Sequence, residues 1–261
     1  MKKTSKIMSL VLAGAMVLSL GACSGGSTAE TTKAAESTEA VTAPSSGEGT
    51  EASSEAGEGE GQTAEGTTYK IGILQLVQHT ALDAANEGFL AALDEAGIQY
   101  DLDSQNASGD QSACQTVASK FANDKKDLIL AIATPAAQAV AGAVTDTPVL
   151  ITAVTDPAES GLVDDNQKPG GNVTGTSDLT PVKEQIDLLK QILPDAKKVG
   201  ILYCSAESNS EIQAQMAREA IEAAGMTSQD FTVSSSNEIQ TVVQSMVGKV
   251  DAIYAPTDNT I

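Results

Sequence analysis

Short apolar segments alternate along the chain with segments of helical periodicity. Two of the apolar segments, residues 128–133 and 149–154, are continuously apolar, which is typical of strands buried on both faces of a parallel sheet. The alanine-rich stretch between them, 135–144, has high helical propensity. Thr134 is expected to cap this helix, and Pro135 to occupy its first position, where the missing N–H costs nothing. The pattern predicts a strand, a helix and a second, parallel strand.

The same periodicities predict the other elements. Strands are expected at 70–76, 98–102, 172–176, 198–203, 231–233 and 251–255, and helices at 81–96, 111–123, 181–193, 207–224 and 239–247. A polar loop is expected at 106–110. Two of the helices are expected to end at Gly97 and Gly225, because glycine adopts the left-handed conformation that closes a helix.

An internal repeat relates the two halves of this list. Lys70-Ile-Gly-Ile-Leu recurs as Lys198-Val-Gly-Ile-Leu, and the two helix-ending glycines are separated by the same number of residues. Each copy reads strand–helix–strand–helix–strand. The repeat predicts an α/β fold of two similar lobes, each a parallel sheet with helices on both faces. We expect the first lobe over 69–178 and the second over 179–261, with the second, shorter copy truncated at its C-terminus.

The N-terminal residues, 1–23, have the features of a lipoprotein signal peptide. A basic start precedes a short apolar run that ends in the lipobox-like Leu20-Gly21-Ala22-Cys23. Cys23 is the expected lipidation site; an ordinary cleaved signal in which Cys23 is incidental is the alternative. Residues 24–68 are rich in Glu, Ser, Thr and Gly and poor in branched aliphatic residues, which predicts a disordered acidic tether.

The charge balance excludes several partners. The chain has 15 basic and 35 acidic residues, a formal net charge of −20, which disfavours nucleic acid. Anionic lipid would also repel the folded part, so membrane attachment is expected to be covalent, through the lipid anchor.

Catalytic and metal-binding motifs are lacking in the sequence. It contains one histidine, His79, and its cysteines do not have metal-ligand spacing, so no metal, no cofactor and no enzymatic activity are expected. Free buried thiols are expected at Cys114 and Cys204, because a disulfide between them would join two lobes that must move. An oxidising compartment leaves that disulfide as the alternative.

The candidate site consists of polar residues and helix starts that follow the predicted strands. Carboxyl ends of parallel strands meet at one edge of a sheet, where open α/β proteins bind ligands. In the first lobe these residues are Gln78, His79, Thr134, Ala136, Ala137, Thr155 and Asp156; in the second they are Glu207, Asn209, Thr257, Asp258 and Asn259.

The chemistry of these residues fits a small zwitterion such as an amino acid. Free N–H groups at Ala136 and Ala137 suit a carboxylate, and Asp156 or Asp258 suits an ammonium group. The alternative for each polar residue is a structural role, because Thr and Asp also cap helices and shape turns. His79 could equally cap helix 81–96 or line a pocket.

Five motifs resemble those of a family of bacterial ABC-importer substrate-binding proteins that includes tryptophan/tyrosine-type binding lipoproteins. They are Ile73-Leu-Gln-Leu-Val-Gln-His, Ala131-Ile-Ala-Thr-Pro-Ala-Ala-Gln-Ala, Thr152-Ala-Val-Thr-Asp-Pro, Pro169-Gly-Gly-Asn-Val-Thr-Gly and Val250-Asp-Ala-Ile-Tyr-Ala-Pro-Thr-Asp-Asn-Thr. The resemblance covers 69–261 and implies a periplasmic-binding-protein-like fold of the first type, with the solute in the cleft between the lobes. The chain departs from the family at Gln78-His79-Thr80, where members carry an acidic residue before His-Pro.

These observations predict an extracytoplasmic, lipid-anchored solute-binding protein of an ABC importer. We expect a monomer that closes on a small zwitterionic ligand, an amino acid and by resemblance an aromatic one, and delivers it to an ABC permease and its ATPase. Closure is expected at crossovers, one of them near Asp178. A ligand-sensing receptor of the same fold, acting on a signalling partner, is the alternative.

Overall fold

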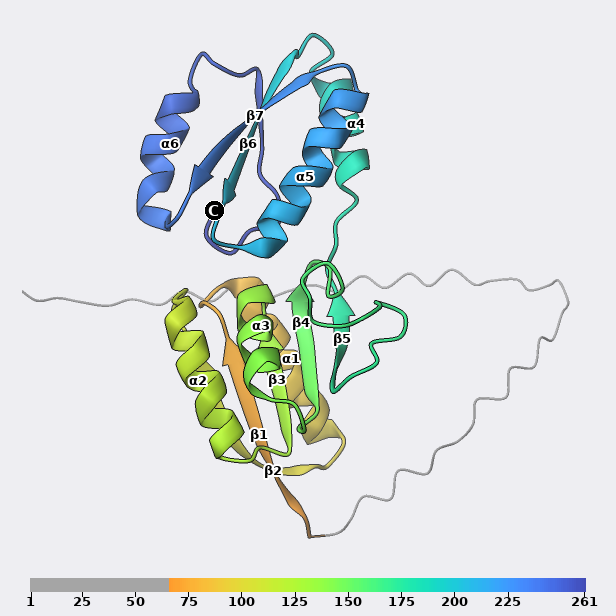
Figure 1. Ribbon diagram of the computed structural model, residues 1–261, viewed down its shortest axis with the longest axis vertical. Coiled ribbons are helices and arrows are strands. Elements are labelled where there is room, and N and C mark those ends of the chain that lie inside the picture. Colours follow the sequence, from red (N-terminus) through yellow and green to blue (C-terminus); the bar gives the residue numbers. More distant parts are fainter. Residues whose placement is uncertain (1–65) are drawn as a thin grey trace, which may run out of the picture. The chain divides into compact units, whose positions relative to one another are not determined.

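The computed structural model describes residues 66–261, which form two separate parallel sheets flanked by helices (Figure 1). The predicted signal peptide, Cys23 and nearly all of the predicted tether lie outside the described residues. The fold class predicted from the sequence is confirmed: both lobes are α/β, and neighbouring strands in both sheets are parallel.

The first sheet has five strands in the order β2-β1-β3-β4-β5. Because the strands are parallel, strands that follow one another in the chain are connected by crossovers, and each crossover except that between β4 and β5 contains a helix. The strands are β1 (Thr68–Gln75), β2 (Gln99–Asn106), β3 (Leu128–Ile132), β4 (Val149–Val154) and β5 (Val173–Ser177), and the helices are α1 (Thr80–Glu95), α2 (Gln111–Asn123) and α3 (Thr134–Ala143).

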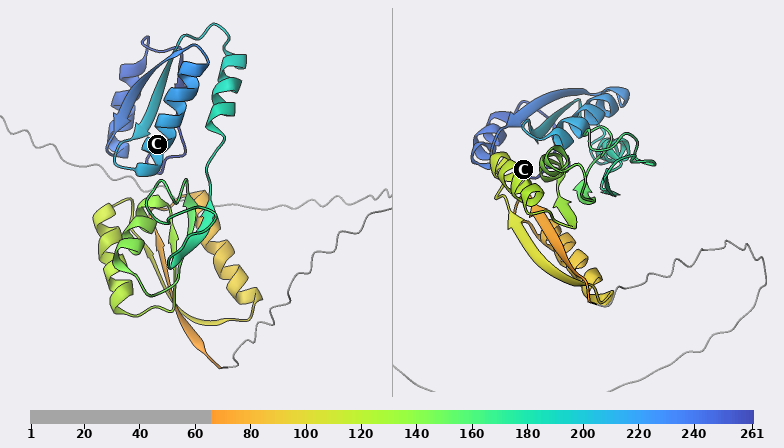
Figure 2. Two further views of the ribbon diagram at one scale, coloured as in Figure 1. Left: turned by 45° about the vertical axis from the view of Figure 1, so that its right-hand side comes forward. Right: turned by 60° about the horizontal axis from the view of Figure 1, so that its bottom comes forward.

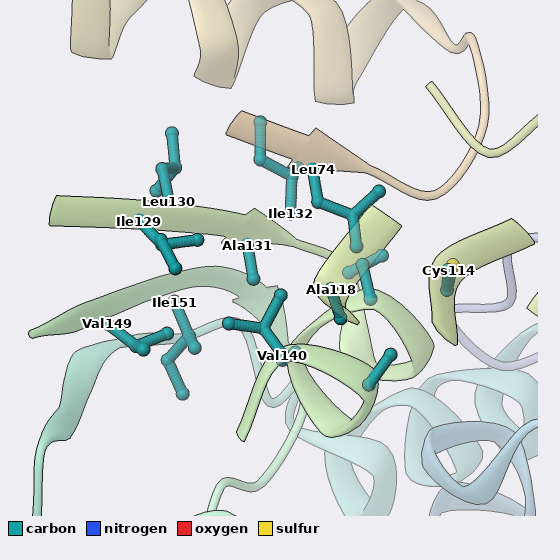
Figure 3. Packing of buried hydrophobic residues seen from close by; sticks show 14 of the residues in the cluster. Leu74, Cys114, Ala118, Ile129, Leu130, Ala131, Ile132, Val140, Val149 and Ile151 are labelled. Atoms are coloured by element: carbon teal, nitrogen blue, oxygen red, sulfur yellow. The ribbon is translucent and has the colours of Figure 1, made fainter. Parts of the chain in front are cut away.

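Helices cover both faces of this sheet. Helix α1 packs on one face, and α2 and α3 lie side by side on the other, as the two views of Figure 2 show. Figure 3 shows the consequence for β3: Leu130 and Ile132 point to one face, while Ile129 and Ala131 point to the other, where Val140 of α3 lies. All five side chains are buried. A strand that buries both faces must be apolar at every position, which explains the continuous run.

Strand β5 approaches β4 too closely for any side chain at Gly175. A Cβ atom there would lie 1.9 Å from the backbone oxygen of Ile151, the residue opposite it in the sheet. Only glycine permits this approach.

The second sheet has three strands in the order β7-β6-β8. Residues Val199, Ile201 and Tyr203 of β6 pack against α4 and α5, whereas Leu202 and Cys204 pack on the opposite face against α6. The strands are β6 (Lys198–Cys204), β7 (Thr227–Val233) and β8 (Ala252–Tyr254), and the helices are α4 (Val182–Ile192), α5 (Ser208–Ala223) and α6 (Ile239–Met246), the last preceded by a 3-10 turn, Ser236–Glu238.

The internal repeat read from the sequence is present in the structure. The strands β2-β1-β3 of the first sheet correspond to β7-β6-β8 of the second. Asp127 and Asp251, which precede the third strand of each copy, accept hydrogen bonds from backbone N–H groups at the start of the first strand, including those of Lys70 and Lys198. The N–H groups of Lys197 and Lys198 lower the pKa of Asp251.

Both predicted helix-ending glycines adopt the left-handed conformation. Gly97 has φ +68° and Gly225 has φ +75°. In each case the N–H of the following residue reaches back to a carbonyl in the last turn of the helix, the hydrogen bond of a Schellman motif. Two strand predictions were too short, because β2 extends to Asn106 and β7 begins at Thr227. Both strands form an edge of their sheet, where polar positions face solvent and the apolar signal is weak.

Candidate functional site

The start of α3 differs from the predicted cap. The helix begins at Thr134, and Ala133 is the N-cap residue, with φ 81° and no side-chain hydrogen bond. The Thr134 hydroxyl therefore does not cap the helix; it is buried and has no hydrogen-bond partner among residues 66–261. The prediction of a free N–H at Ala137 is also wrong, because that group donates to the Ala133 carbonyl at 3.0 Å. The Ala136 N–H has no acceptor within residues 66–261.

All three residues predicted at this helix start are buried. Thr134 is 1% exposed, and Ala136 and Ala137 are 0% exposed. A solute can therefore reach the Thr134 hydroxyl and the Ala136 N–H only when the groups that cover them move aside. An unpartnered hydroxyl next to a free helix-start N–H remains suited to a carboxylate.

At the end of β1, Gln78 and His79 lie on the surface of the first lobe. His79 is the N-cap of α1, and its Nδ1 accepts a hydrogen bond from the Ala81 N–H at 3.2 Å. Of the two roles left open for this histidine, the structure shows the helix cap. Gln78 lines a polar cavity of about 560 Å³ together with side chains of β1, α1 and β2.

Five of the other predicted residues belong to one buried hydrogen-bond network. At its centre is Gln213 of α5, which is 0% exposed and was not predicted. Its amide N–H groups donate to the Thr155 hydroxyl at 3.3 Å and to the Thr257 carbonyl at 2.9 Å. Its amide oxygen accepts from the Thr257 N–H at 3.2 Å and from the Thr180 hydroxyl at 3.4 Å. Gln213 thereby connects the end of β4, the crossover and the loop after β8.

Glu207, only 4% exposed, forms the other half of the network. Its carboxylate accepts from the Asn259 side-chain amide at 2.6 Å, the Asn259 N–H at 3.2 Å and the Thr260 hydroxyl at 2.8 Å. Asn209 donates to the same carboxylate at 3.3 Å and to the Thr257 carbonyl at 3.3 Å. No ion pair involves Glu207 within the described part of the chain, so neutral donors alone satisfy this buried charge.

Asp156 and Asp258, the predicted ammonium partners, both bind backbone N–H groups. Asp258 Oδ2 accepts from the Cys204 N–H at 2.7 Å, and Oδ1 accepts from the N–H groups of Thr260 and Ile261. Asp156 Oδ1 accepts from Ala158, Glu159 and Asn166. These contacts are those of turn-shaping residues. A role in ligand binding stays a prediction for both aspartates. Asp156 is the better candidate, because its second carboxylate oxygen accepts no hydrogen bond from residues 66–261 and is available to a ligand.

A second cavity, of about 850 Å³, is lined by both lobes. Asp156 and Glu159 contribute from the first lobe, Leu179 from the crossover, and Ser205–Ser208 and one face of α5 from the second. Polar contacts also join the lobes directly: Gln111 donates to the Ala206 carbonyl at 2.7 Å, and Gln138 donates to the Ser208 hydroxyl at 3.1 Å.

Cys114 and Cys204 are buried, one in each lobe, and neither forms a disulfide in the described residues. Burial raises the pKa of Cys114 to about 11, and it also raises the pKa of Cys204. Both thiols are therefore protonated at neutral pH and poorly reactive.

Within residues 66–261, no group of three His, Cys, Asp or Glu side chains is arranged to hold a metal ion. No helix in the same range is sufficiently long and apolar to cross a membrane.

Several residues of the network and the cavity were not predicted from the sequence, among them Gln75, Asp83, Asn86 and Gln213. The last three lie inside helices, where a polar residue ordinarily faces solvent and gives no sign of a site. Gln75 could have been found from the sequence, because it is a polar residue that interrupts the apolar run of β1. In the structure it is only 3% exposed.

Two α/β lobes, each built on a parallel sheet, form the type I periplasmic-binding-protein fold. The chain belongs to the family described as ABC transporter substrate binding protein, whose profile matches residues 70–261. The family resemblance read from the five sequence motifs is thereby confirmed.

Three relatives illustrate the similarity. A tyrosine-binding protein of Clostridioides difficile (strain R20291) is 45% identical over 195 residues, which cover 73% of this chain but only 56% of the relative's length. The structure of an ABC domain from Streptococcus pneumonia in complex with L-Trp is 44% identical, with TM-score 0.71, and covers 75% of this chain and 67% of that one. A ligand-free, open substrate binding protein with adhesive properties from Clostridium difficile is 47% identical, with TM-score 0.54, over 74% and 66% of the two chains.

Proposed function

We propose that this protein is an extracytoplasmic solute-binding lipoprotein of an ABC importer that holds one aromatic amino acid between its lobes. A small zwitterion with a carboxylate and an ammonium group fits the polar groups along the sheet edges. The protein acts as a monomer and passes the solute to an ABC permease with its ATPase. It binds and releases the solute without chemical change.

The observation that carries the proposal is the start of α3. A helix of ten residues begins there with an unpartnered, buried Thr134 hydroxyl beside the free Ala136 N–H. A buried polar group without a partner costs stability, and a ligand carboxylate would satisfy both donors. Relatives named for tyrosine binding and solved with L-Trp support an aromatic amino acid as the solute.

Isothermal titration calorimetry of the full-length protein against the common amino acids tests this function. We expect L-tyrosine or L-tryptophan to bind and to raise the thermal unfolding midpoint, because a ligand at 100 times its dissociation constant stabilises by about 2.7 kcal/mol. If no amino acid binds, the proposed function is wrong.

Substitution of Thr134 by valine tests whether its hydroxyl binds the carboxylate of the amino acid. The variant keeps the shape and removes only the hydroxyl, so affinity for the bound amino acid should fall about tenfold or more. Unfolding stability should stay equal or rise, because the hydroxyl has no hydrogen-bond partner to lose within the described residues. A variant that binds like the parent would show that the carboxylate is held elsewhere.

The lipid anchor is a separate part of the proposal and rests on the sequence around Cys23. Cys23→Ser removes the thiol that would carry the lipid, so the protein should appear in the soluble extracytoplasmic fraction or the medium. Immunoblots of membrane and soluble fractions measure the change, with Cys114→Ser as the matched control. Retention of Cys23→Ser on the membrane at the parental level would contradict the anchor.

A further inference from the structure

The polar cavity in the first lobe has unmet hydrogen-bonding capacity. It occupies about 560 Å³ at the carboxyl ends of β1 and β2, beside the first two turns of α1. Its walls include Gln75, Gln78, Asp83, Asn86, Ser104 and Asn106, of which Gln78 alone was expected at a site.

Gln75, only 3% exposed, organises the wall of this cavity. Its amide N–H groups donate to Asp83 Oδ1 at 2.6 Å and to the Val77 carbonyl at 2.9 Å, and its oxygen accepts from the Asn86 amide at 3.2 Å. The side chain thus holds both Asp83 and Asn86 in place.

Two hydrogen-bond acceptors in the cavity wall receive no hydrogen bond from the described residues. Asn86 Oδ1 is buried and has no hydrogen-bond partner in the described part of the chain. The second oxygen of Asp83, Oδ2, receives no hydrogen bond from residues 66–261, and no ion pair neutralises this carboxylate within them. No Lys, Arg or His is among the residues that line the cavity. A hydrogen-bond donor of a ligand would satisfy these two acceptors.

The cavity and the start of α3 lie on neighbouring strands at the same edge of the sheet. The Leu76 N–H donates to the Ile132 carbonyl at 3.2 Å, and α3 begins two residues later. Neighbouring strands are separated by about 4.8 Å. A solute whose carboxylate lies at α3 therefore has the β1 end of the edge next to it.

We propose that this cavity receives the hydrogen-bond donor on the ring of the solute, the hydroxyl of tyrosine or the indole N–H of tryptophan. Asp83 and Asn86 accept this hydrogen bond, and Gln75 positions both. The inference rests on the proposed function above and names the residues that determine side-chain specificity. A site built to accept a hydrogen bond rejects an analogue without the donor, because its acceptors are then left unpaired.

L-Tyrosine and L-phenylalanine differ only in the ring hydroxyl and are the probes for this test. In calorimetric titrations of the full-length protein, we expect L-tyrosine to bind at least about tenfold more tightly than L-phenylalanine. In Asp83→Asn and in Asn86→Ala the ratio of the two affinities should fall below about threefold.

Glu87→Gln is the matched control, because it removes one carboxylate from the exposed side of the same helix and does not line the cavity. It should keep the wild-type ratio. Thermal unfolding of each variant checks that the fold is intact, and Asp83→Asn retains an oxygen that can accept from Gln75.

The outcomes separate the inference from the function on which it rests. If the wild-type protein binds no amino acid, the proposed function fails. If it binds one, but both cavity variants keep the wild-type ratio, the cavity does not receive the ring donor and the inference is overturned. It is also overturned if the variants lose only the preference for L-tyrosine over 3-(4-hydroxyphenyl)propionate, because the cavity would then hold the ammonium group.

Discussion

Replacing Phe121 by alanine is expected to lower the free energy of unfolding by about 3–5 kcal/mol. The ring is 0% exposed at the end of α2 and belongs to the main core cluster. The Lys126 ammonium lies 5.4 Å from the ring centroid and adds a cation–π contact. The truncation therefore leaves a cavity and also removes that contact. Urea titration followed by far-UV circular dichroism measures the change, since the chain has no tryptophan for fluorescence.

Two further variants sharpen this test. Phe89→Ala removes the same side chain from α1, where the ring is only partly buried against the same core, so its cost should be clearly smaller. Gly72→Ala places a Cβ atom 3.0 Å from the Phe121 ring and should destabilise the parent by overpacking. In the Phe121→Ala background the ring is gone and only Lys126 Cγ, at 3.3 Å, stays close to the added methyl group. The double variant should therefore be more stable than the sum of the single effects predicts. Additive effects would mean that the two residues do not pack as described.

Replacing Glu207 by alanine is expected to cost about 2–4 kcal/mol, because hydrogen bonds to a charged group are strong and their donors lose their acceptor. The carboxylate binds four donors, from Asn209, Asn259 and Thr260, and holds the loop after β8 against the start of α5. Equilibrium unfolding of the full-length protein measures the loss.

Glu211→Ala is the matched control, one turn further along α5. Its side chain is 53% exposed and pairs with Arg218 on the surface, so its removal should cost less than about 1 kcal/mol. Glu207→Gln distinguishes structure from binding. If Glu207 contacts the solute, the amide should weaken amino-acid affinity strongly with a smaller change in stability. Equal stability losses for Glu207→Ala and Glu211→Ala would contradict the buried network.

The residues at the carboxyl edges of the sheets could be predicted from the sequence only in part. The sequence predicted that Thr155, Asn209 and Thr257 lie in one region, because parallel strands all end at the same edge of their sheet, and the structure places them in one network. It could not say that their hydrogen bonds run through Gln213, which is more than forty residues from both Thr155 and Thr257. In the sequence of a helix, a glutamine that belongs to a buried hydrogen-bond network cannot be distinguished from one that faces solvent.

The sequence by itself determined the elements, the duplicated topology and the family. Continuous apolar runs must be buried on both faces, Gly97 and Gly225 supply the conformation that ends a helix, and repeated patterns fold alike. Only the tertiary structure decided what each polar group does, because hydrogen bonds depend on distances between segments that are remote in the chain. It gave the carboxylates of Glu207 and Asp258 protein partners and left the Thr134 hydroxyl and Asn86 Oδ1 without any within the described residues.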